Sequence, residues 1–147
     1  MANIIYNAGL RELLTGATAI DVGTWKVLLE RSTSTYVPDK DDNSILDAPN
    51  MVQVSVATYE IQTIATPTIT AVDGSDLVKI DCDNVEFGAL EAGQTVKAII
   101  VYRDDAGDGI PLLYIDTDSG SLLPRALGGG DFTVAINAAG LITFAQA

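Results

Sequence analysis

The chain has 147 residues, 48% of them hydrophobic and 19% charged, so we expect a single folded domain (residues 1–147) and not a disordered segment. Eight basic against twenty acidic residues give a formal net charge of −12, which disfavours nucleic acid and membrane surfaces as partners. Because the chain has no histidine and one cysteine, the usual zinc sites, the Ser-His-Asp triad, the Cys-His pair and an internal disulfide are excluded.

The N-terminal segment predicts an amphipathic helix over about residues 3–16. Asn3 is a suitable N-cap, Gly16 a suitable end, and the apolar side chains share one helix face: Tyr6, Leu10, Leu13, Leu14 and Ala17. A helix that packs on the core and one that docks on a partner have the same pattern. No signal peptide or membrane span is evident, so we expect synthesis in the cytosol.

The next segment predicts a half-buried strand, because Trp25, Val27 and Leu29 alternate with Lys26, Leu28 and Glu30. Residues 31–50 are polar and contain two prolines. A loop of this length in a compact domain is usually functional or mobile. These residues are therefore the first candidate for a contact loop.

Beyond residue 50, short β-prone segments follow one another about every eight to twelve residues, separated by Gly, Asp, Asn or Pro. The segments are MVQVSVA, YEIQTIA, TPTITAV, LVKIDCD, NVEF, TVKAIIVY, PLLYIDT, FTVAIN and LITF. They predict a mainly β fold, an antiparallel β-sandwich or a barrel, with one N-terminal α-helix. The last two segments flank a turn at Asn137 and Gly140, which predicts a C-terminal hairpin.

The acidic loops are the candidate metal sites. Asp39, Asp41 and Asn43 take positions 1, 3 and 5 of a calcium loop, but Ser44 and Asn50 replace the glycine and the bidentate glutamate that such a loop needs. We therefore expect a solvated loop with Asx-turns.

A second acidic loop lies in VYRDDAGDGIPLLYIDT, residues 101–117. The spacing of Asp104, Asp105 and Asp108 also misses the calcium pattern. The stretch predicts a hairpin whose tip is formed by the acidic residues and glycines.

The remaining candidates for chemistry have simpler explanations. Asp116 and Asp118 share a strand face if the strand continues, but paired carboxylates at a strand end are usually turn formers. The GGGD stretch at residues 128–131 precedes a predicted strand, whereas a phosphate cradle precedes a helix. Cys82 alternates onto the face of Val78 and Ile80, which is typical of a small buried hydrophobe. We expect no catalytic residues, metal or cofactor, and hence no enzyme.

A set of stretches, taken in order, resembles a family of small virion proteins of tailed bacteriophages. They are MANIIYNAGLRELLTG, WKVLLE with TYVPDKDD, NVEFGAL with VKAIIVYRDD, PLLYIDT, and GGGDFTVAINAAGLITF. The closing pattern of the family is matched by Phe132, Val134, Asn137, Gly140 and Phe144. Residues 57–70 follow the pattern less closely.

The resemblance implies a structural protein of the virion that is synthesised in the host cytoplasm. Its first interpretation is a capsid decoration or cement protein with a jelly-roll-like sandwich. Its implied partners are the phage major capsid protein and further copies of itself, as a dimer or trimer, on the capsid surface. Alternatives are a tail, collar or fibre-base protein, or a carbohydrate or calcium-dependent receptor-binding module. Loop length and expected exposed apolar residues give the candidate interface residues: Ile4, Ile5, Tyr6, Tyr36, Val37, Pro38 and Ile45.

Overall fold

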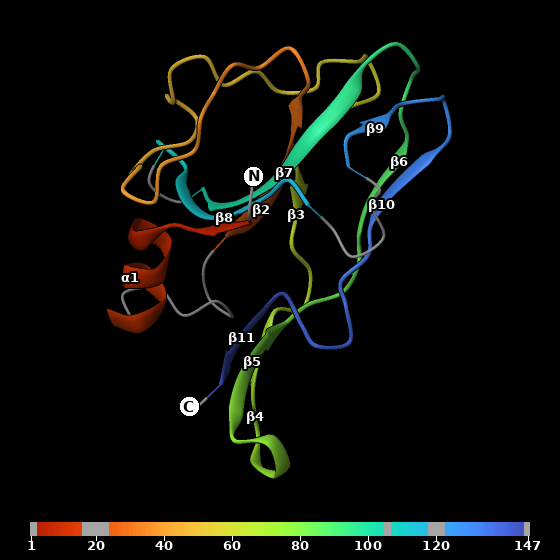
Figure 1. Ribbon diagram of the computed structural model, residues 1–147. Helices are drawn as coiled ribbons and strands as arrows, with labels where there is room; N and C mark the ends of the chain where they lie inside the picture. Colours follow the sequence, from red (N-terminus) through yellow and green to blue (C-terminus); the bar gives the residue numbers. More distant parts are fainter. Residues whose placement is uncertain (1–2, 16–23, 105–106, 118–122, 146–147) are drawn as a thin grey trace.

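The computed structural model, which describes residues 3–15, 24–104, 107–117 and 123–145, is mainly β with one N-terminal helix (Figure 1). Within these ranges the strands form three antiparallel sheets and no closed barrel. The predicted class, mainly β with antiparallel strands and a helix at the N-terminus, is confirmed at this level.

The largest sheet, called here the main sheet, has the strand order β1-β8-β7-β2-β3, and β9 also pairs with β7. Its strands are β1 (Ile4–Ile5), β2 (Trp25–Arg31), β3 (Gln62–Thr63), β7 (Thr95–Arg103), β8 (Ile110–Ile115) and β9 (Arg125–Ala126). Val101 lies opposite Leu113 and Arg103 opposite Ile110. The hairpin predicted for residues 101–117 is therefore confirmed as β7 and β8.

Two smaller sheets complete the fold. One pairs β10 (Asp131–Val134) with β6 (Val85–Ala89), and the other has the order β11-β5-β4. This three-stranded sheet comprises β4 (Thr68–Val72), β5 (Leu77–Asp81) and β11 (Ile142–Ala145), and a 3-10 turn, η1 (Asp73–Ser75), joins β4 to β5. The β4–β5 hairpin extends away from the main sheet, at the bottom of Figure 1.

The predicted C-terminal hairpin is wrong, although its turn is present. Gly140 has a φ of 91°, and its N–H donates to the carbonyl of Asn137 at 2.7 Å. The flanking strands then separate, since β10 pairs with β6 and β11 pairs with β5. Local turn chemistry fixes the reversal of the chain, but each strand finds a partner from elsewhere in the sequence.

The helix α1 (Asn7–Thr15) is shorter than predicted at its start. Ile4 and Ile5 form β1 and lie opposite Tyr114 and Leu113. Asn3 does not cap the helix, because its side chain donates to the carbonyl of Thr117 at 2.9 Å. The predicted end at Gly16 and the apolar position Ala17 lie outside the described residues. No helix in the described part of the chain has the length and apolar character needed to cross a membrane.

The contact between α1 and β8 depends on a glycine. A Cβ atom at Gly9 would lie 2.5 Å from the carbonyl oxygen of Pro111 and 2.6 Å from the Cα of Leu112. Only a residue without a side chain allows the two backbones to approach this closely. The N-terminal half of α1 therefore packs on the fold, with Ala8 buried, while Leu14 near its C-terminal end is 75% exposed.

The strand predicted at residues 24–30 is confirmed as β2, but its predicted half-burial is wrong, because both faces of the main sheet are covered. Val27 and Leu29 belong to a hydrophobic cluster that includes Ile80 and Phe132 of the small sheets. Leu28, on the opposite face of the same strand, belongs to a second cluster. That cluster includes Tyr6, Tyr36, Ile45, Ala98, Ile100, Tyr102 and Tyr114. The polar segment 31–50 thus contributes to the core instead of forming a free loop.

The segment MVQVSVA does not form a strand. Its only strand-like pairing is an isolated bridge between Gln53 and Glu30. Val54 is nevertheless buried, at 2% exposure, and its N–H donates to the carbonyl of Leu29 at 2.9 Å. The alternating pattern of this segment reflects burial along the edge of β2 without a continuous ladder.

Candidate interaction surface

The acidic loop at residues 39–43 uses its carboxylates to fix its own conformation. Asp42 Oδ2 accepts hydrogen bonds from the Tyr36 hydroxyl at 2.6 Å and from the Asp39 N–H at 2.9 Å. Asp39 Oδ1 accepts from the Asp41 N–H at 3.1 Å, and Asp41 Oδ1 accepts from Asn7 Nδ2 at 2.7 Å. The described residues contain no group of three or more acidic or cysteine side chains arranged to hold a metal ion.

A buried polar network anchors this segment to the main sheet. Glu30 is fully buried, and its carboxylate accepts from the Tyr114 hydroxyl at 2.7 Å and from Lys97 Nζ at 3.1 Å. Lys97 Nζ also donates to the carbonyl of Tyr36 at 3.1 Å, and the hydroxyls of Tyr36 and Tyr6 lie 2.9 Å apart. The network thus connects β2, β7 and β8 with the segment that covers them.

Burial controls the ionisation of these tyrosines. The pKa of Tyr114 is raised above its ordinary value mainly by desolvation, and the hydrogen bond to Glu30 raises it further. Desolvation also raises the pKa of Tyr36, and the hydrogen bond that its hydroxyl donates to Asp42 adds to this effect. A neutral phenol can donate a hydrogen bond to a carboxylate, whereas a phenolate cannot. The phenols therefore act as structural donors.

The candidate interface residues divide into two groups. Tyr6, Tyr36, Pro38 and Ile45 are buried, so the expectation that they are exposed is wrong. Their apolar surfaces pack on the main sheet, which the sequence pattern of a polar loop did not reveal. Ile4 is half-buried, Ile5 is 39% exposed and Val37 is 70% exposed. A contact with a partner at Ile5 and Val37 stays a prediction.

The acidic tip between β7 and β8 is also held by the fold. Asp104 pairs with Lys26, the Ser44 hydroxyl donates to the carbonyl of Asp108 at 2.6 Å, and the Ile45 N–H donates to the carbonyl of Gly109 at 2.9 Å. Asp105 lies outside the described residues. These contacts give the described part of the tip a structural role as a turn docked on residues 44–45.

The other predicted candidates take structural positions where they are described. Asp116 follows β8, and Asp118 lies outside the described residues. Cys82 is half-buried against the core, and burial raises the pKa of its thiol to about 11, which disfavours the reactive thiolate. The GGGD stretch leads into strand β10, as the sequence predicted.

A surface on the three-stranded sheet has no internal partner among the described residues. Strand pairing aligns Ile69, Ile80 and Ile142 in one row, and Ala71, Val78 and Phe144 in the next row toward the hairpin tip. Because side chains two residues apart on a strand share a face, these six form one surface, called here the apolar face.

The apolar face begins in the core and continues into solvent. Ile80 and Ile142 are buried, at 3% and 5% exposure. Ile69 is 54%, Val78 40% and Phe144 38% exposed. Large apolar side chains exposed next to one another are uncommon on a monomer and usually mark a contact surface.

The opposite face of this sheet is more polar and makes its own contacts. Thr70, Lys79 and Thr143 form one row across it. Lys79 Nζ lies 2.7 Å from Asp81 Oδ2 and donates to the carbonyl of Ala138 at 3.2 Å. The hydrogen bond from Lys79 lowers the pKa of Asp81. Among the described residues, the polar face therefore makes internal contacts, whereas the apolar face has no internal partner beyond its buried end.

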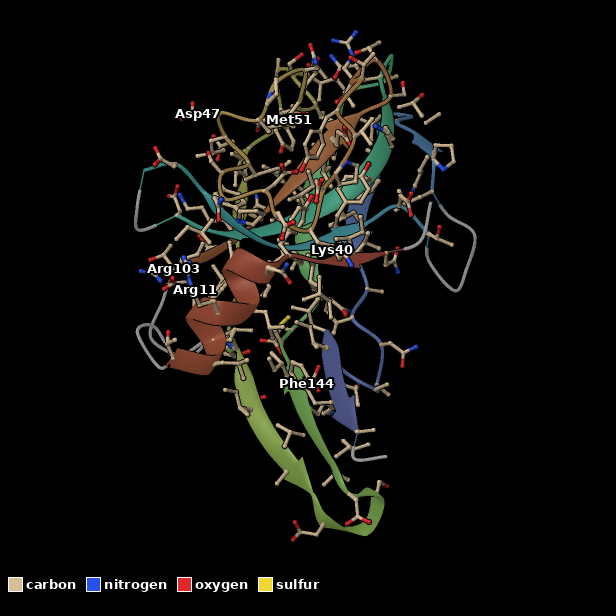
Figure 2. The ribbon with its side chains drawn as sticks, turned by 60° about the vertical axis from the view of Figure 1, so that its left-hand side comes forward. Arg11, Lys40, Asp47, Met51, Arg103 and Phe144 are labelled. Carbon is tan, nitrogen blue, oxygen red and sulfur yellow. The ribbon has the colours of Figure 1, made fainter. Side chains whose placement is uncertain are left out.

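The C-terminal end of α1 turns the apolar face into a groove. Leu13 and Leu14 of the helix and Ile69, Val78, Ile80 and Phe144 of the sheet line a hollow of about 410 Å³. Figure 2 shows Phe144 between α1 and the far end of the β4–β5 hairpin. The alternation of β4, β5 and β11 could have identified the apolar face from the sequence. It could not show that the face extends beyond the core.

Comparisons with protein-family models, with curated proteins and with solved structures found no match to this chain.

Proposed function

We propose that this chain is a non-enzymatic structural protein of a tailed-bacteriophage virion, a decoration or cement protein that binds the major capsid protein on the capsid surface. We also propose that its sheets stack as a β-sandwich of the jelly-roll type. The ordered resemblance from the N-terminal helix to the closing Phe132–Phe144 pattern supports both proposals. It is the reason for choosing a virion over other assemblies.

The observation that carries the structural role is the exposed apolar face. A chain with a net charge of −12 repels its neighbours over most of its surface, yet it exposes Ile69, Val78 and Phe144 together beside Leu14 of α1. Exposing such apolar side chains to water is unfavourable, so the surface favours association with a partner that covers it. A protein that reinforces a shell needs such contact surfaces and no reaction chemistry.

The internal hydrogen bonds of the buried and loop polar side chains support a non-enzymatic role. Glu30, Lys97 and Tyr114 satisfy one another inside the main sheet, and Asp42 holds the turn that begins at Asp39. Groups consumed by internal hydrogen bonds stabilise a fold but are poorly placed to bind a substrate.

Quantitative mass spectrometry of purified virion fractions tests the proposal. DNA-filled heads separated from tails should contain the chain on the order of hundreds of copies, comparable with the major capsid protein. A few copies confined to the tail fraction would instead favour a tail, collar or fibre-base protein. Absence from both fractions would overturn the virion assignment.

The contact with the shell can be tested at the exposed candidate residues. We expect Val37→Asp and Ile5→Asp to weaken binding of the purified chain to heads that lack it, while the circular dichroism spectrum stays unchanged. Binding equal to that of the unaltered chain would remove residues 4–6 and 36–45 as the shell contact.

Calorimetry tests the alternative of a calcium-dependent receptor-binding module. Calcium titrated into the chain should give no heat of binding, because the described carboxylates of the 39–43 loop are engaged in turn hydrogen bonds. A saturable signal would favour the receptor-binding module.

A further inference from the structure

The apolar face is uncharged along its length but differs in charge at its two ends. At the tip of the hairpin, Asp73 and Asp76 line a second hollow of about 410 Å³ together with Val78 and Phe144. At the base, Leu14 of α1 lines the groove, and Arg11 lies one helical turn before it. The Arg11 side chain is 65% exposed and lies 3.5 Å from Glu12, whose carboxylate Arg103 also binds at 2.6 Å. The apolar face thus has the carboxylates of Asp73 and Asp76 at one end and the exposed Arg11 guanidinium near the other.

Val78 lies between the acidic tip of the hairpin and the groove at its base. Ile80 lies two residues after Val78 on β5, about 7 Å along the strand, and Asp76 lies two residues before it, in the turn just ahead of β5. A second hairpin laid antiparallel on the first, with Val78 over Val78, would place its acidic tip over the groove beside α1. The same contact would form twice, as a two-fold interface requires.

The net charge of the chain limits which surfaces of two copies can meet. With a net charge of −12, most self-contacts place carboxylates opposite carboxylates, and like charges brought together disfavour association. The six residues of the apolar face carry no charge. An antiparallel arrangement also separates the two acidic tips, whereas a parallel one would place Asp73 and Asp76 of both copies side by side.

From these features we propose that a second copy of this chain covers the apolar face, with the two β4–β5–β11 sheets packed face to face and antiparallel about a two-fold axis near Val78. The inference deepens the proposed function, on which it rests for its setting, by naming the surface through which copies associate. Because the net charge of −12 on each copy opposes the contact, we expect self-association to be reversible and in the micromolar range.

Sedimentation equilibrium of the purified full-length chain, from about 1 to about 500 µM, tests the inference. The unaltered chain should pass from monomer to dimer within this range. Val78→Asp and Val78→Lys should each weaken the dimer at least about tenfold, because each places two like charges face to face on the axis. An equimolar mixture of the two variants should dimerise again, since Asp then meets Lys.

A matched control is Val52→Asp, which makes the same change at a valine of similar exposure, 38% against 40% for Val78, beside β2 of the main sheet. Its dimer constant should equal that of the unaltered chain. Ile69→Asp provides a second probe of the apolar face if Val78→Asp fails to fold, since Ile69 is 54% exposed. Circular dichroism spectra and thermal unfolding of each variant check folding.

The outcomes separate this inference from the proposed function. The inference would be overturned if the unaltered chain stays monomeric throughout the concentration range. It would also be overturned if folded Val78→Asp and Ile69→Asp variants dimerise like the unaltered chain. Either result would hold even if phage heads contain the chain. Loss of the dimer in both single variants without recovery in the mixture would overturn the two-fold axis near Val78. A chain that dimerises as described but is absent from virions would overturn the proposed function and leave the inference standing.

Discussion

The main sheet and the three-stranded sheet are built from similar alternating strands but differ in what covers them. In the main sheet, β2 buries Val27 and Leu29 on one face and Leu28 on the other. In the three-stranded sheet, Ile80 is buried while Val78, two residues away on the same face, is 40% exposed. Alternation thus defines the two faces of a strand, whereas the rest of the fold decides whether each face is covered.

The two sheets also differ in the setting of their ion pairs. Glu30 and Lys97 meet inside the main sheet, where the carboxylate is fully buried and also accepts from Tyr114. Lys79 and Asp81 meet on the outer face of the three-stranded sheet, where both side chains remain partly in water. Water screens the first pair less than the second, because Glu30 is fully buried although Lys97 is 26% exposed, so equal substitutions should have unequal effects.

The largest expected effect comes from breaking the buried ion pair. Lys97→Met leaves the Glu30 carboxylate buried without its cation, so the free energy of unfolding should fall by about 3 kcal/mol. Lys79→Met makes the same change in the exposed pair and should lower it by less than about 1 kcal/mol. Urea denaturation of both variants measures the difference. Equal effects would show that the main sheet does not shield Glu30 from water.

The same isoleucine-to-threonine change in each sheet tests whether that sheet face is covered. Ile100 is fully buried in the main sheet, so Ile100→Thr removes apolar contacts and buries a hydroxyl, which should lower the free energy of unfolding by about 2 to 3 kcal/mol. Ile69→Thr on the apolar face should lower it by less than about 0.5 kcal/mol when measured at concentrations where the chain is a monomer. A large effect of Ile69→Thr in the monomer would mean that the chain itself covers this face.

Substitution of Gly9 tests the packing of α1 on the main sheet. Gly9→Ala places a Cβ against the β8 backbone, which must shift, so we expect a loss of about 1 to 3 kcal/mol in the free energy of unfolding. Gly74→Ala in the exposed turn of the three-stranded sheet meets nothing within 4 Å and should change it by less than about 0.5 kcal/mol. Chemical denaturation compares the two, and a neutral Gly9→Ala would rule out the close approach of α1 to β8.

Titration to alkaline pH tests the burial of the tyrosine phenols. Their raised pKa values affect the free energy of unfolding only above about pH 10, so this prediction has the smallest effect at neutral pH. Burial raises the pKa of both Tyr59 and Tyr102 to about 12 from the ordinary 10.0. Because the folded pKa exceeds the unfolded one, this stability is fully present below pH 10 and is lost as the pH rises toward 12. Tyrosinate absorbance should therefore appear together with unfolding and not near pH 10.

A single variant isolates one of these phenols. Tyr59→Phe should lower the free energy of unfolding by about 1 kcal/mol at pH 7, because the Leu29 N–H loses its acceptor, and should make the alkaline loss of stability less steep. An unchanged alkaline profile would contradict the burial of Tyr59.

Some of the fold could be predicted from local patterns. The class, the β7–β8 hairpin and the turn at Gly140 follow from alternation and from residues that tolerate a positive φ. The C-terminal hairpin could not be predicted correctly, because β10 and β11 pair with β6 and β5, which precede them by about 45 to 65 residues in the sequence.

The candidate site was less predictable than the fold. Tyr36 and Ile45 lie in a polar, proline-containing segment that resembles a free loop, yet the sheet beneath it is apolar on both faces and buries them. Leu14, Ile69 and Phe144 come from three distant segments, so no local pattern indicates that they line one groove.

The sequence by itself determined the mainly β class, the acidic charge, the lack of histidine chemistry and the side of each strand that is apolar, because these depend on residue type and on a period of two. Only the tertiary structure decided which apolar sides are covered. Residues 34–51 and the small sheets cover the two faces of the main sheet, while the β4–β5 hairpin extends past them (Figure 1) and leaves Val78 and the neighbouring Phe144 of β11 partly exposed. Whether an apolar side is covered depends on contacts between segments far apart in the chain, and the spacing of residues along the sequence does not predict those contacts.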